Sequence, residues 1–152
     1  MIEFPNEESK WTWLAGLIDC DSSITLNKSP SKTAKRGYSL KSALFFEQTN
    51  EELANEFKKV ATANSKIFSP RYKHGSPTWR VCLYAEKLRI LLPKISPFLI
   101  KKKEQAKLLL DALSLIKQHS SGHTPNDKPL LEIYHKLRSL HEKGKHKGGN
   151  KK

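Results

Sequence analysis

Residues 13–24 read WLAGLIDCDSSI, and this stretch has two features that helix propensity alone does not produce. Gly16 falls inside a predicted helix, where glycine costs roughly 1 kcal/mol relative to alanine, so beside Ala15 it indicates that another backbone approaches closely. Asp19 and Asp21 fall at the negative carboxyl end of the same helix, where a carboxylate is disfavoured by about 0.3–1 kcal/mol unless a cation compensates. The stretch therefore predicts a tightly packed helix with a bound cation at its end.

The oxygen ligands at this helix end suit Mg²⁺, which prefers carboxylate, carbonyl and water oxygens and accepts substrate phosphate to complete an octahedron. A single aspartate per chain can suffice if two copies of the helix pack side by side about a two-fold axis. Their ends then bring two carboxylates together beneath two backbone phosphates, ready for metal-assisted phosphodiester hydrolysis. Each chain would supply half of such a site.

Periodicity on both sides of this stretch predicts alternating helices and short strands. The first helix is expected over residues 7–19, with Asn6 as its N-cap and Glu7 and Glu8 next to the positive end of its dipole. Period-two strands and helices of 3.6-residue periodicity follow in the order αββαββααα. The strands are expected at 23–27, 39–48, 66–73 and 78–84, and the later helices at 51–63 and around Leu88, Leu109 and Ile133.

Strands that are joined as hairpins form an antiparallel sheet. We therefore predict an α+β fold in which a curved, four-stranded antiparallel sheet carries its helices on one face. The other face stays free. Such a face can lie in the major groove of DNA, because a β-ribbon fits the groove width of about 12 Å and alternate side chains point toward the bases.

The charge of the chain indicates a polyanionic partner. Its 152 residues include 28 Lys and Arg against 15 acidic residues, which gives a net charge of +13. We expect one domain over residues 1–142, followed at 143–152 by a basic tail that is disordered. Because the folded body stays basic without the tail lysines, nucleic acid is the expected partner.

Several other classes of protein are disfavoured. No apolar run approaches the roughly 20 residues that a membrane-spanning helix needs, and residues 1–9 are acidic, unlike a signal peptide. Cys20 and Cys82 form no CxxC pair, and the six histidines lack zinc-finger spacing. We therefore expect an intracellular protein, in an organelle or a prokaryotic cytoplasm, with no membrane partner and neither a zinc site nor a disulfide scaffold.

Residues 14–22, LAGLIDCDS, resemble the LAGLIDADG motif of homing endonucleases and depart from it at Cys20 and Ser22. An αββαββα order, the strand end FEQT at 46–49 and the stretch PFLIKKKEQA at 97–106 also resemble the single-motif, homodimeric enzymes of this family. The resemblance covers most of the chain, and the sequence holds no second copy of the motif. It implies a homodimeric, intron-encoded endonuclease that makes double-strand breaks with short 3′ overhangs at a long pseudo-palindromic DNA target.

The resemblance also implies roles for individual residues. Asp21, the last acid of the motif, would bind Mg²⁺ with the Cys20 backbone carbonyl as a second oxygen, whereas Asp19 would be structural. Mn²⁺ would substitute for Mg²⁺, and Ca²⁺ would bind without supporting cleavage. Gln48 resembles the polar residue that positions water in the catalytic pocket, and Lys102 resembles the basic residue that stabilises charge there.

Plainer interpretations of the same residues stay open. Gln48 could end its strand as a solvated amide, and Ser22 could bond a phosphate. The lysines at 101–103 stand near a helix start, where cations oppose the dipole, so they indicate a nearby phosphate unless Pro97 starts the helix earlier. The chain as a whole could be a maturase-like or purely binding protein that holds RNA or DNA without cutting, although the retained Asp21 favours cleavage.

Two surfaces are predicted from the phases of the strands and the first helix. The outward strand phase assigns DNA contacts to Ser23, Thr25, Asn27, Ser39, Lys41, Ala43, Phe45 and Glu47 on the first hairpin and to Arg71, Lys73 and Arg80 on the second. The arginines would read guanine or pair with phosphates, and Phe45 would contact a thymine methyl or else show that the register is wrong. The dimer interface is assigned to Trp13, Leu14, Ala15, Gly16, Leu17 and Asp19.

Overall fold

A computed structural model describes the backbone of residues 2–34, 37–61, 68–73, 76–118 and 128–148, without the side chains at 68–73, 76, 117–118 and 142–148. The predicted order of elements is confirmed. The helices are α1 Glu7–Asp21, α2 Glu51–Val60, α3 Ala85–Ile95, α4 Lys103–Gln118 and α5 Lys128–Gly148, with a 3₁₀ turn η1 at Ser96–Phe98, and the strands are β1 Ser22–Pro30, β2 Tyr38–Gln48, β3 Phe68–Lys73 and β4 Ser76–Tyr84. Within the described ranges, no helix is long and apolar enough to cross a membrane.

The four strands form one antiparallel sheet, as predicted, and their order in it is β1-β2-β4-β3. β1 pairs with β2 over all nine of its residues, β2 continues onto β4, and β3 forms the second edge. The pairing of β3 with β4 is irregular between Phe68 and Arg71. Pro70 lies in this irregular part of an edge strand, where the missing backbone N–H of proline is tolerated.

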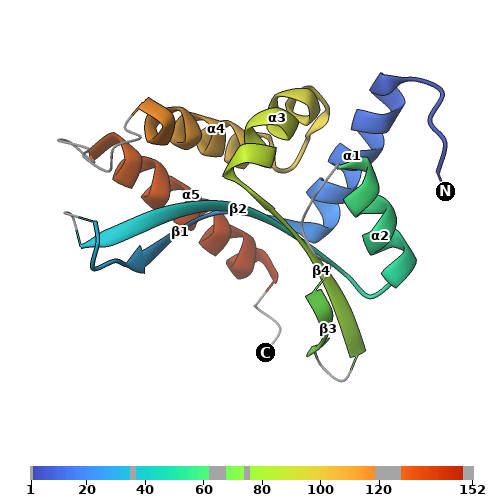
Figure 1. The fold of residues 1–152 in the computed structure, drawn as a ribbon, viewed down its shortest axis with the longest axis horizontal. Helices are drawn as coiled ribbons and strands as arrows, with labels where there is room; N and C mark the ends of the chain where they lie inside the picture. Colours follow the sequence, from blue (N-terminus) through green and yellow to red (C-terminus); the bar gives the residue numbers. More distant parts are fainter. Residues whose placement is uncertain (1, 35–36, 62–67, 74–75, 119–127, 149–152) are drawn as a thin grey trace.

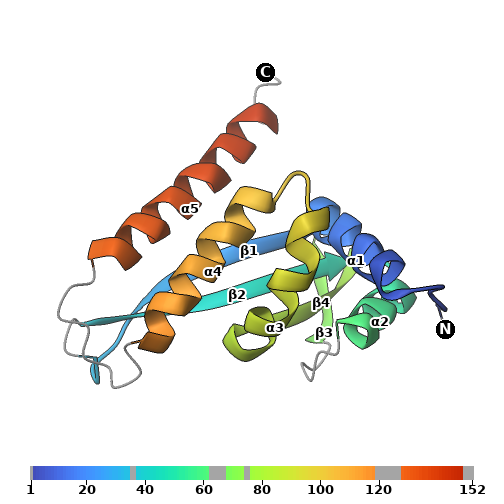
Figure 2. The ribbon, with the colours of Figure 1, turned by 90° about the horizontal axis from the view of Figure 1, so that it is seen from above.

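Helices lie on one face of the sheet and leave the other face open. Figure 1 shows α1, α3 and α4 above the strands, with β3 and β4 curving downward. Seen from above, α3 and α4 cross the middle of the sheet, whereas α1 and α2 lie at the end where β1 begins and β2 ends (Figure 2). The predicted two-layer α+β architecture is therefore present, with the helices next to one another and the opposite sheet face uncovered.

The covered face carries the apolar phase of the strands. Ile24, Leu44 and Leu83 stand opposite one another in the registers of β1, β2 and β4, and each is at most 1% exposed. Phe46 has the same phase and stacks on Phe57 of α2, with ring centroids 4.0 Å apart. Because burying one such side chain contributes about 1.5–3 kcal/mol, this layer fixes which face of the sheet stays open.

Helix α5 lies beside the sheet rather than on it. It runs along α4 and along the outer edge of β1 (Figure 2), and His141 Nε2 lies 2.8 Å from the Ile24 carbonyl oxygen. Covering an edge strand in this way blocks its pairing with other chains. The backbone is helical as far as Gly148, so the first part of the tail predicted from residue 143 continues α5, and residues 149–152 lie outside the described residues.

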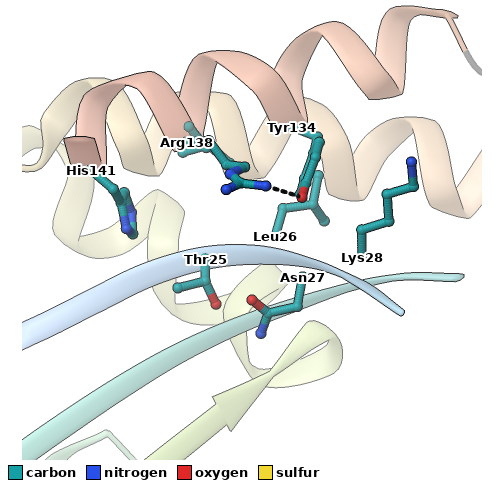
Figure 3. A pocket seen from close by; sticks show the side chains of 8 residues that line it. Thr25, Leu26, Asn27, Lys28, Tyr134, Arg138 and His141 are labelled. Carbon is teal, nitrogen blue, oxygen red and sulfur yellow. Dashed lines mark hydrogen bonds between the residues drawn. The ribbon is translucent and has the colours of Figure 1, made fainter. Parts of the chain in front are cut away.

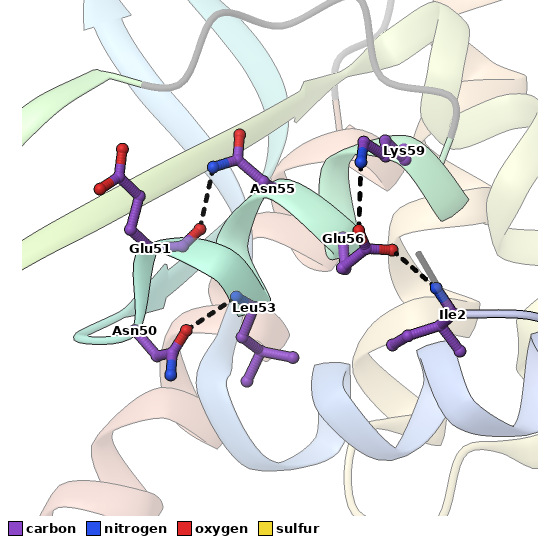
Figure 4. Close-up of polar contacts among 7 residues, drawn as sticks. All are labelled: Ile2, Asn50, Glu51, Leu53, Asn55, Glu56 and Lys59. Atoms are coloured by element: carbon purple, nitrogen blue, oxygen red, sulfur yellow. Dashed lines mark hydrogen bonds and ion pairs between the residues drawn. The ribbon is translucent and has the colours of Figure 1, made fainter.

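Two asparagines, Asn6 and Asn50, are the N-caps of α1 and α2. Asn6 Oδ1 accepts a hydrogen bond from Ser9 N at 2.8 Å, as the sequence predicts for an N-cap. Asn50 Oδ1 accepts one from Leu53 N at 2.9 Å (Figure 4). Each such cap contributes about 1 kcal/mol. β2 ends at Gln48, and Asn50, two residues later, begins α2 as its N-cap.

The amino-terminal segment is attached to α2 through Glu56. This carboxylate accepts hydrogen bonds from Lys59 Nζ at 3.1 Å and from the backbone N of Ile2 at 3.4 Å (Figure 4). The Lys59 hydrogen bond is the main reason why the pKa of Glu56 is lowered, and the Ile2 amide adds to it. The segment before α1 is thus held against a helix that follows it by some 50 residues.

Asp19 joins the end of α1 to the start of α4. Its carboxylate accepts hydrogen bonds from three successive backbone amides, those of Ile100 at 2.8 Å, Lys101 at 3.0 Å and Lys102 at 2.8 Å. The residue is only 9% exposed. Since α4 begins at Lys103, Asp19 binds three successive amides of the segment that leads into this helix. We call these contacts the Asp19 clamp.

The clamp corrects two predictions from the sequence. Asp19 at the helix end does not need a metal ion, because backbone amides compensate its charge. The lysines at 101–103 do not need a phosphate to offset the helix dipole, because Asp19 is the anion at the start of α4. Pro97 lies in the separate turn η1 rather than at the start of this helix.

Replacing Asp19 with alanine is expected to lower the free energy of unfolding by on the order of 3–5 kcal/mol, because three amides lose a charged acceptor at once. Urea unfolding followed by circular dichroism measures this change. Asp111→Ala on the exposed side of α4 is the matched control and should stay within about 0.5 kcal/mol of wild type. Equal losses in the two variants would show that the clamp contributes nothing special to stability.

Candidate active site and nucleic-acid interface

Asp21 is the last residue of α1 and stands exposed at the end of the sheet where β1 begins. Gln48, the last residue of β2, donates a hydrogen bond from Nε2 to Asp21 Oδ2 at 3.0 Å. The β1–β2 register causes this approach, because Ser22 follows Asp21 and pairs with Phe46, just before Gln48. The structure thus brings together two predicted catalytic residues that are 27 positions apart in the sequence.

The Gln48 amide is held in one orientation. Its Oε1 accepts hydrogen bonds from Thr49 N at 2.9 Å and from Thr49 Oγ1 at 3.3 Å. The amide nitrogen is therefore the end that faces Asp21, and its second hydrogen can bind a water molecule or a phosphate oxygen. Gln48 is a positioned donor rather than a freely solvated strand end.

Lys102 brings a cation to the same helix end. Its side chain is half-buried, and Nζ donates a hydrogen bond to the Asp19 carbonyl oxygen at 3.1 Å. Burial is the main reason why the pKa of Lys102 is lowered, repulsion from Lys101 lowers it further, and Asp19, Cys20 and Asp21 act in the opposite direction. The Asp19 clamp sets this geometry, because it binds the backbone amide of the same lysine.

The ligands at the end of α1 fit Mg²⁺. Asp21 is exposed and offers carboxylate oxygen, and the adjoining Cys20, also exposed, carries the backbone carbonyl predicted as a second ligand. Among the described residues, no group of three His, Cys, Asp or Glu side chains could hold a metal ion. Mg²⁺ needs no such cage, because one or two carboxylates commonly bind it while waters and substrate phosphates complete its coordination.

Ser22 stands where the family motif has glycine and joins α1 to β1. Its backbone is extended, with φ −121° and ψ 164°, so this position does not require glycine. The hydroxyl donates a hydrogen bond to the Ile18 carbonyl oxygen at 2.7 Å, which satisfies one acceptor that the end of a helix leaves open. The Ser22 proton is therefore used within the chain rather than on a phosphate.

The uncovered side of the sheet, which we call the open face, carries the predicted phase of β1, β2 and β4. The strand registers place on it Ser23, Thr25, Asn27, Ser39, Lys41, Ala43, Phe45, Glu47 and Arg80. The buried residues Ile24, Leu44 and Leu83 occupy the opposite phase. The predicted facing of these strands is confirmed, and contact with DNA stays a prediction.

Burial overturns one predicted contact and reveals another residue. Ala43 lies on the open face but is only 2% exposed, with Thr25 Oγ1 donating to its carbonyl oxygen at 3.3 Å. Tyr84 stands opposite Ala43 and is 54% exposed, so it presents the surface at this point. The sequence prediction omitted Tyr84, although alternation from Arg80 through Cys82 leads to it.

Arg80 is held on the open face by two neighbours. Its Nε and Nη2 both reach Glu47 Oε1 in an ion pair, and its guanidinium carbon lies 4.9 Å from the Phe45 ring centroid. The Phe45 ring thus belongs on this face, and its partner here is a guanidinium. Because the ion pair and the ring contact hold the planar guanidinium group in place, it loses less conformational entropy when it binds a base or a phosphate.

Two further predicted DNA contacts lie on β3. Its register pairs Arg71 with Thr78 and Lys73 with Ser76. The side chains of Arg71 and Lys73 lie outside the part of the chain that the structure describes, so their roles stay predictions.

Only part of the predicted dimer interface is accessible. Three of its six residues are buried within their own chain, namely Leu14, Ala15 and Asp19. Helix α1 packs against the sheet, α2, α3 and η1, and Asp19 faces the amides before α4, which corrects the assignment of these three residues. Gly16 is exposed, and a Cβ added to it would meet no atom within 4 Å. Trp13 and Leu17 beside it are half-buried, so the outer side of α1 combines apolar side chains with an open glycine.

No family sequence model matches the chain, and no curated protein matches it in sequence. Among solved structures it is similar to the homing endonuclease I-CvuI in complex with the I-CreI target, at 23% identity and a TM-score of 0.66, over 88% of this chain and 83% of that one. It is also similar to the archaeal intron-encoded homing endonuclease I-Vdi141I complexed with DNA, at 19% identity and a TM-score of 0.74, over 89% of this chain and 86% of that one.

A third similar structure is the I-LtrWI LAGLIDADG homing endonuclease bound to target DNA, at 19% identity and a TM-score of 0.67. This match covers 84% of the present chain and 43% of the other. At such identities the likeness concerns the arrangement of the helices and strands. Together with the LAGLIDCDS helix at 14–22 and the four-stranded sheet, it shows that the chain has the fold of the LAGLIDADG homing endonucleases.

Proposed function

We propose that the chain is a site-specific DNA endonuclease that acts as a homodimer. It makes a Mg²⁺-dependent double-strand break with short 3′ overhangs at a long pseudo-palindromic target. The observation that carries this proposal is the assembly of Asp21, Gln48 and Lys102 at one end of an open sheet face, in a chain of net charge +13. The similar structures support it, since they are homing endonucleases with bound DNA, one of them intron-encoded.

Each residue of the site has its own part in hydrolysis. Asp21 and the Cys20 carbonyl would hold Mg²⁺, which would supply charge neutralisation at the scissile phosphate and activation of water. Gln48 orients water with the amide hydrogen that Asp21 does not use. Lys102 offsets the negative charge that develops as water adds to phosphorus and the ester oxygen departs. Asp19 positions this lysine and does not touch the substrate.

The outer side of α1 accommodates a second copy of the chain. Gly16 leaves open space there, and Ile100, next to the Asp19 clamp, is 89% exposed although it is apolar. One chain matches most of I-CvuI and I-Vdi141I but only 43% of I-LtrWI, which suggests that it corresponds to half of a longer protein of this fold. Two α1 helices about a two-fold axis bring both Asp21 residues together and imply two symmetric half-sites.

Replacing Asp21 with asparagine is expected to lower cleavage of a plasmid carrying the intronless insertion locus by more than about 100-fold, because loss of a direct ligand exceeds the effect of losing an outer partner. Binding to the same DNA should persist or tighten, since a negative charge facing phosphates is removed. A gel assay with Mg²⁺, with Ca²⁺ and with EDTA measures both cleavage and binding.

The matched control is Asp111→Asn on the exposed side of α4, which should cleave as wild type does. Full-rate cleavage by Asp21→Asn would rule out the proposed metal site. Tight binding by wild type with no cleavage under any divalent cation would instead favour a maturase-like or purely binding protein.

Gly16→Leu is expected to leave the folding of a single chain intact, because the added side chain meets open space and leucine favours helix. In a tight helix pair the same side chain overpacks the contact by about 1–3 kcal/mol, so the dissociation constant of the dimer should rise about 5- to 150-fold. Sedimentation over a range of concentrations measures this. Ser114→Leu, on the exposed side of α4, controls for added apolar surface, and an unchanged Gly16→Leu dimer would exclude α1 from the interface.

Burial lowers the pKa of Lys102. As the pH rises, the side chain therefore loses its proton and its charge before an ordinary lysine does, whose pKa is about 10.4. Cleavage that uses this cation should fall as the pH rises through the lowered pKa. Lys102→Arg, which keeps its charge, should remove this alkaline limb, whereas Lys107→Arg should keep it. For folding the sign is reversed, since protonation of Lys102 opposes the folded state and stability increases as the pH rises through that pKa. Identical profiles for wild type and Lys102→Arg would contradict this role.

A further inference from the structure

A cleft of about 300 Å³ lies between α5 and the edge strand β1 (Figure 3). We call it the α5 cleft. Its polar lining consists of Thr25, Asn27, Lys28, Tyr134, Arg138 and His141, and two leucines complete it. Helix α5 takes no part in the arrangement around Asp21, so the proposed hydrolysis does not account for this cleft.

The α5 cleft is cationic. Lys28 and Arg138 contribute positive charge, and none of the residues that line the cleft is acidic. Arg138 Nη1 donates a hydrogen bond to the Tyr134 hydroxyl at 3.1 Å, as Figure 3 shows, and this contact orients the guanidinium. The cleft therefore matches an anion, and its volume suffices for a phosphate group with bound waters, since one water occupies about 30 Å³.

The α5 cleft is continuous with the open face. Lys28 points from β1 toward α5, whereas Thr25 and Asn27, which belong to the open face, point to the other side of the strand (Figure 3). The lining thus wraps around the edge of the sheet. The carboxyl end of α5 lies below the strands, on the side away from α1, α3 and α4 (Figure 1). A duplex that lies on the open face therefore runs past this cleft.

We propose that the α5 cleft binds the phosphodiester backbone of the same DNA duplex, flanking the base pairs that the open face reads. This inference rests on the proposed DNA-binding function and extends it to a second contact surface. Lys28 and Arg138 make charge-assisted contacts with phosphate oxygens, while Asn27 adds an uncharged donor. His141 holds α5 against the strand through its contact with Ile24 O. Contacts of this kind strengthen binding to every DNA sequence alike.

The test is the salt dependence of binding to a labelled, mixed-sequence duplex of about 30 base pairs, roughly three helical turns. Fluorescence anisotropy gives the slope of log K against log salt concentration for wild type, Lys28→Gln, Arg138→Gln and the double variant. Each lost phosphate contact should reduce the magnitude of the slope by about 0.9, and the double variant by about twice that.

Lys136→Gln is the matched control, because Lys136 is exposed on the same helix and does not line the cleft. It should keep a slope close to that of wild type, and thermal unfolding should show all variants folded. Equal slopes for wild type and the double variant, or an equal loss in Lys136→Gln, would overturn the cleft assignment while leaving the nuclease proposal standing. If the variants reduced the slope only for binding to an RNA duplex of the same length, the choice of DNA would be overturned. Failure of wild type to bind duplex DNA would defeat the proposed function itself.

Discussion

The carboxylate of Asp19 holds three backbone amides at the start of α4, and the geometry of the catalytic candidates depends on this interaction. It is strong because a charge meets three aligned donors where little water competes with them. Fixing the Lys102 amide lets the Lys102 side chain return to the end of α1. The same anchoring holds that end beside β1, where Asp21 meets Gln48. Asp19, which has a structural role, thus positions Asp21, the proposed metal ligand.

Two acids of one short motif have opposite roles because of helical geometry. Residues two positions apart on an α-helix differ by about 200° around its axis, so Asp19 and Asp21 cannot face the same surroundings. The first turns inward to the amides before α4, and the second stays exposed at the helix end. The same rotation divides the motif into an inner side with Leu14 and Ala15 and an outer side with Gly16.

On the open face, the period-two sequence pattern predicts which way the side chains point but not which neighbours they contact. Period-two patterning placed nine predicted contacts on one side of β1, β2 and β4, and the registers confirm that placement. Patterning did not indicate that Ala43 is covered, that Tyr84 is exposed opposite it, or that Glu47 and Phe45 hold Arg80. These facts depend on which residues of neighbouring strands stand side by side, and register is a property of the pairing rather than of a single strand.

The sequence by itself determined the order of the elements, the N-cap at Asn6, the apolar phase of the strands and the motif that carries Asp21. All of these are local, because periodicity and capping depend on residues within a few positions of one another. Tertiary structure decided the partner of Asp19, which lies 81 to 83 positions away, and the position of α5 against β1. An amphipathic pattern states which side of an element is buried but not what buries it, and that choice is made only when distant segments pack together.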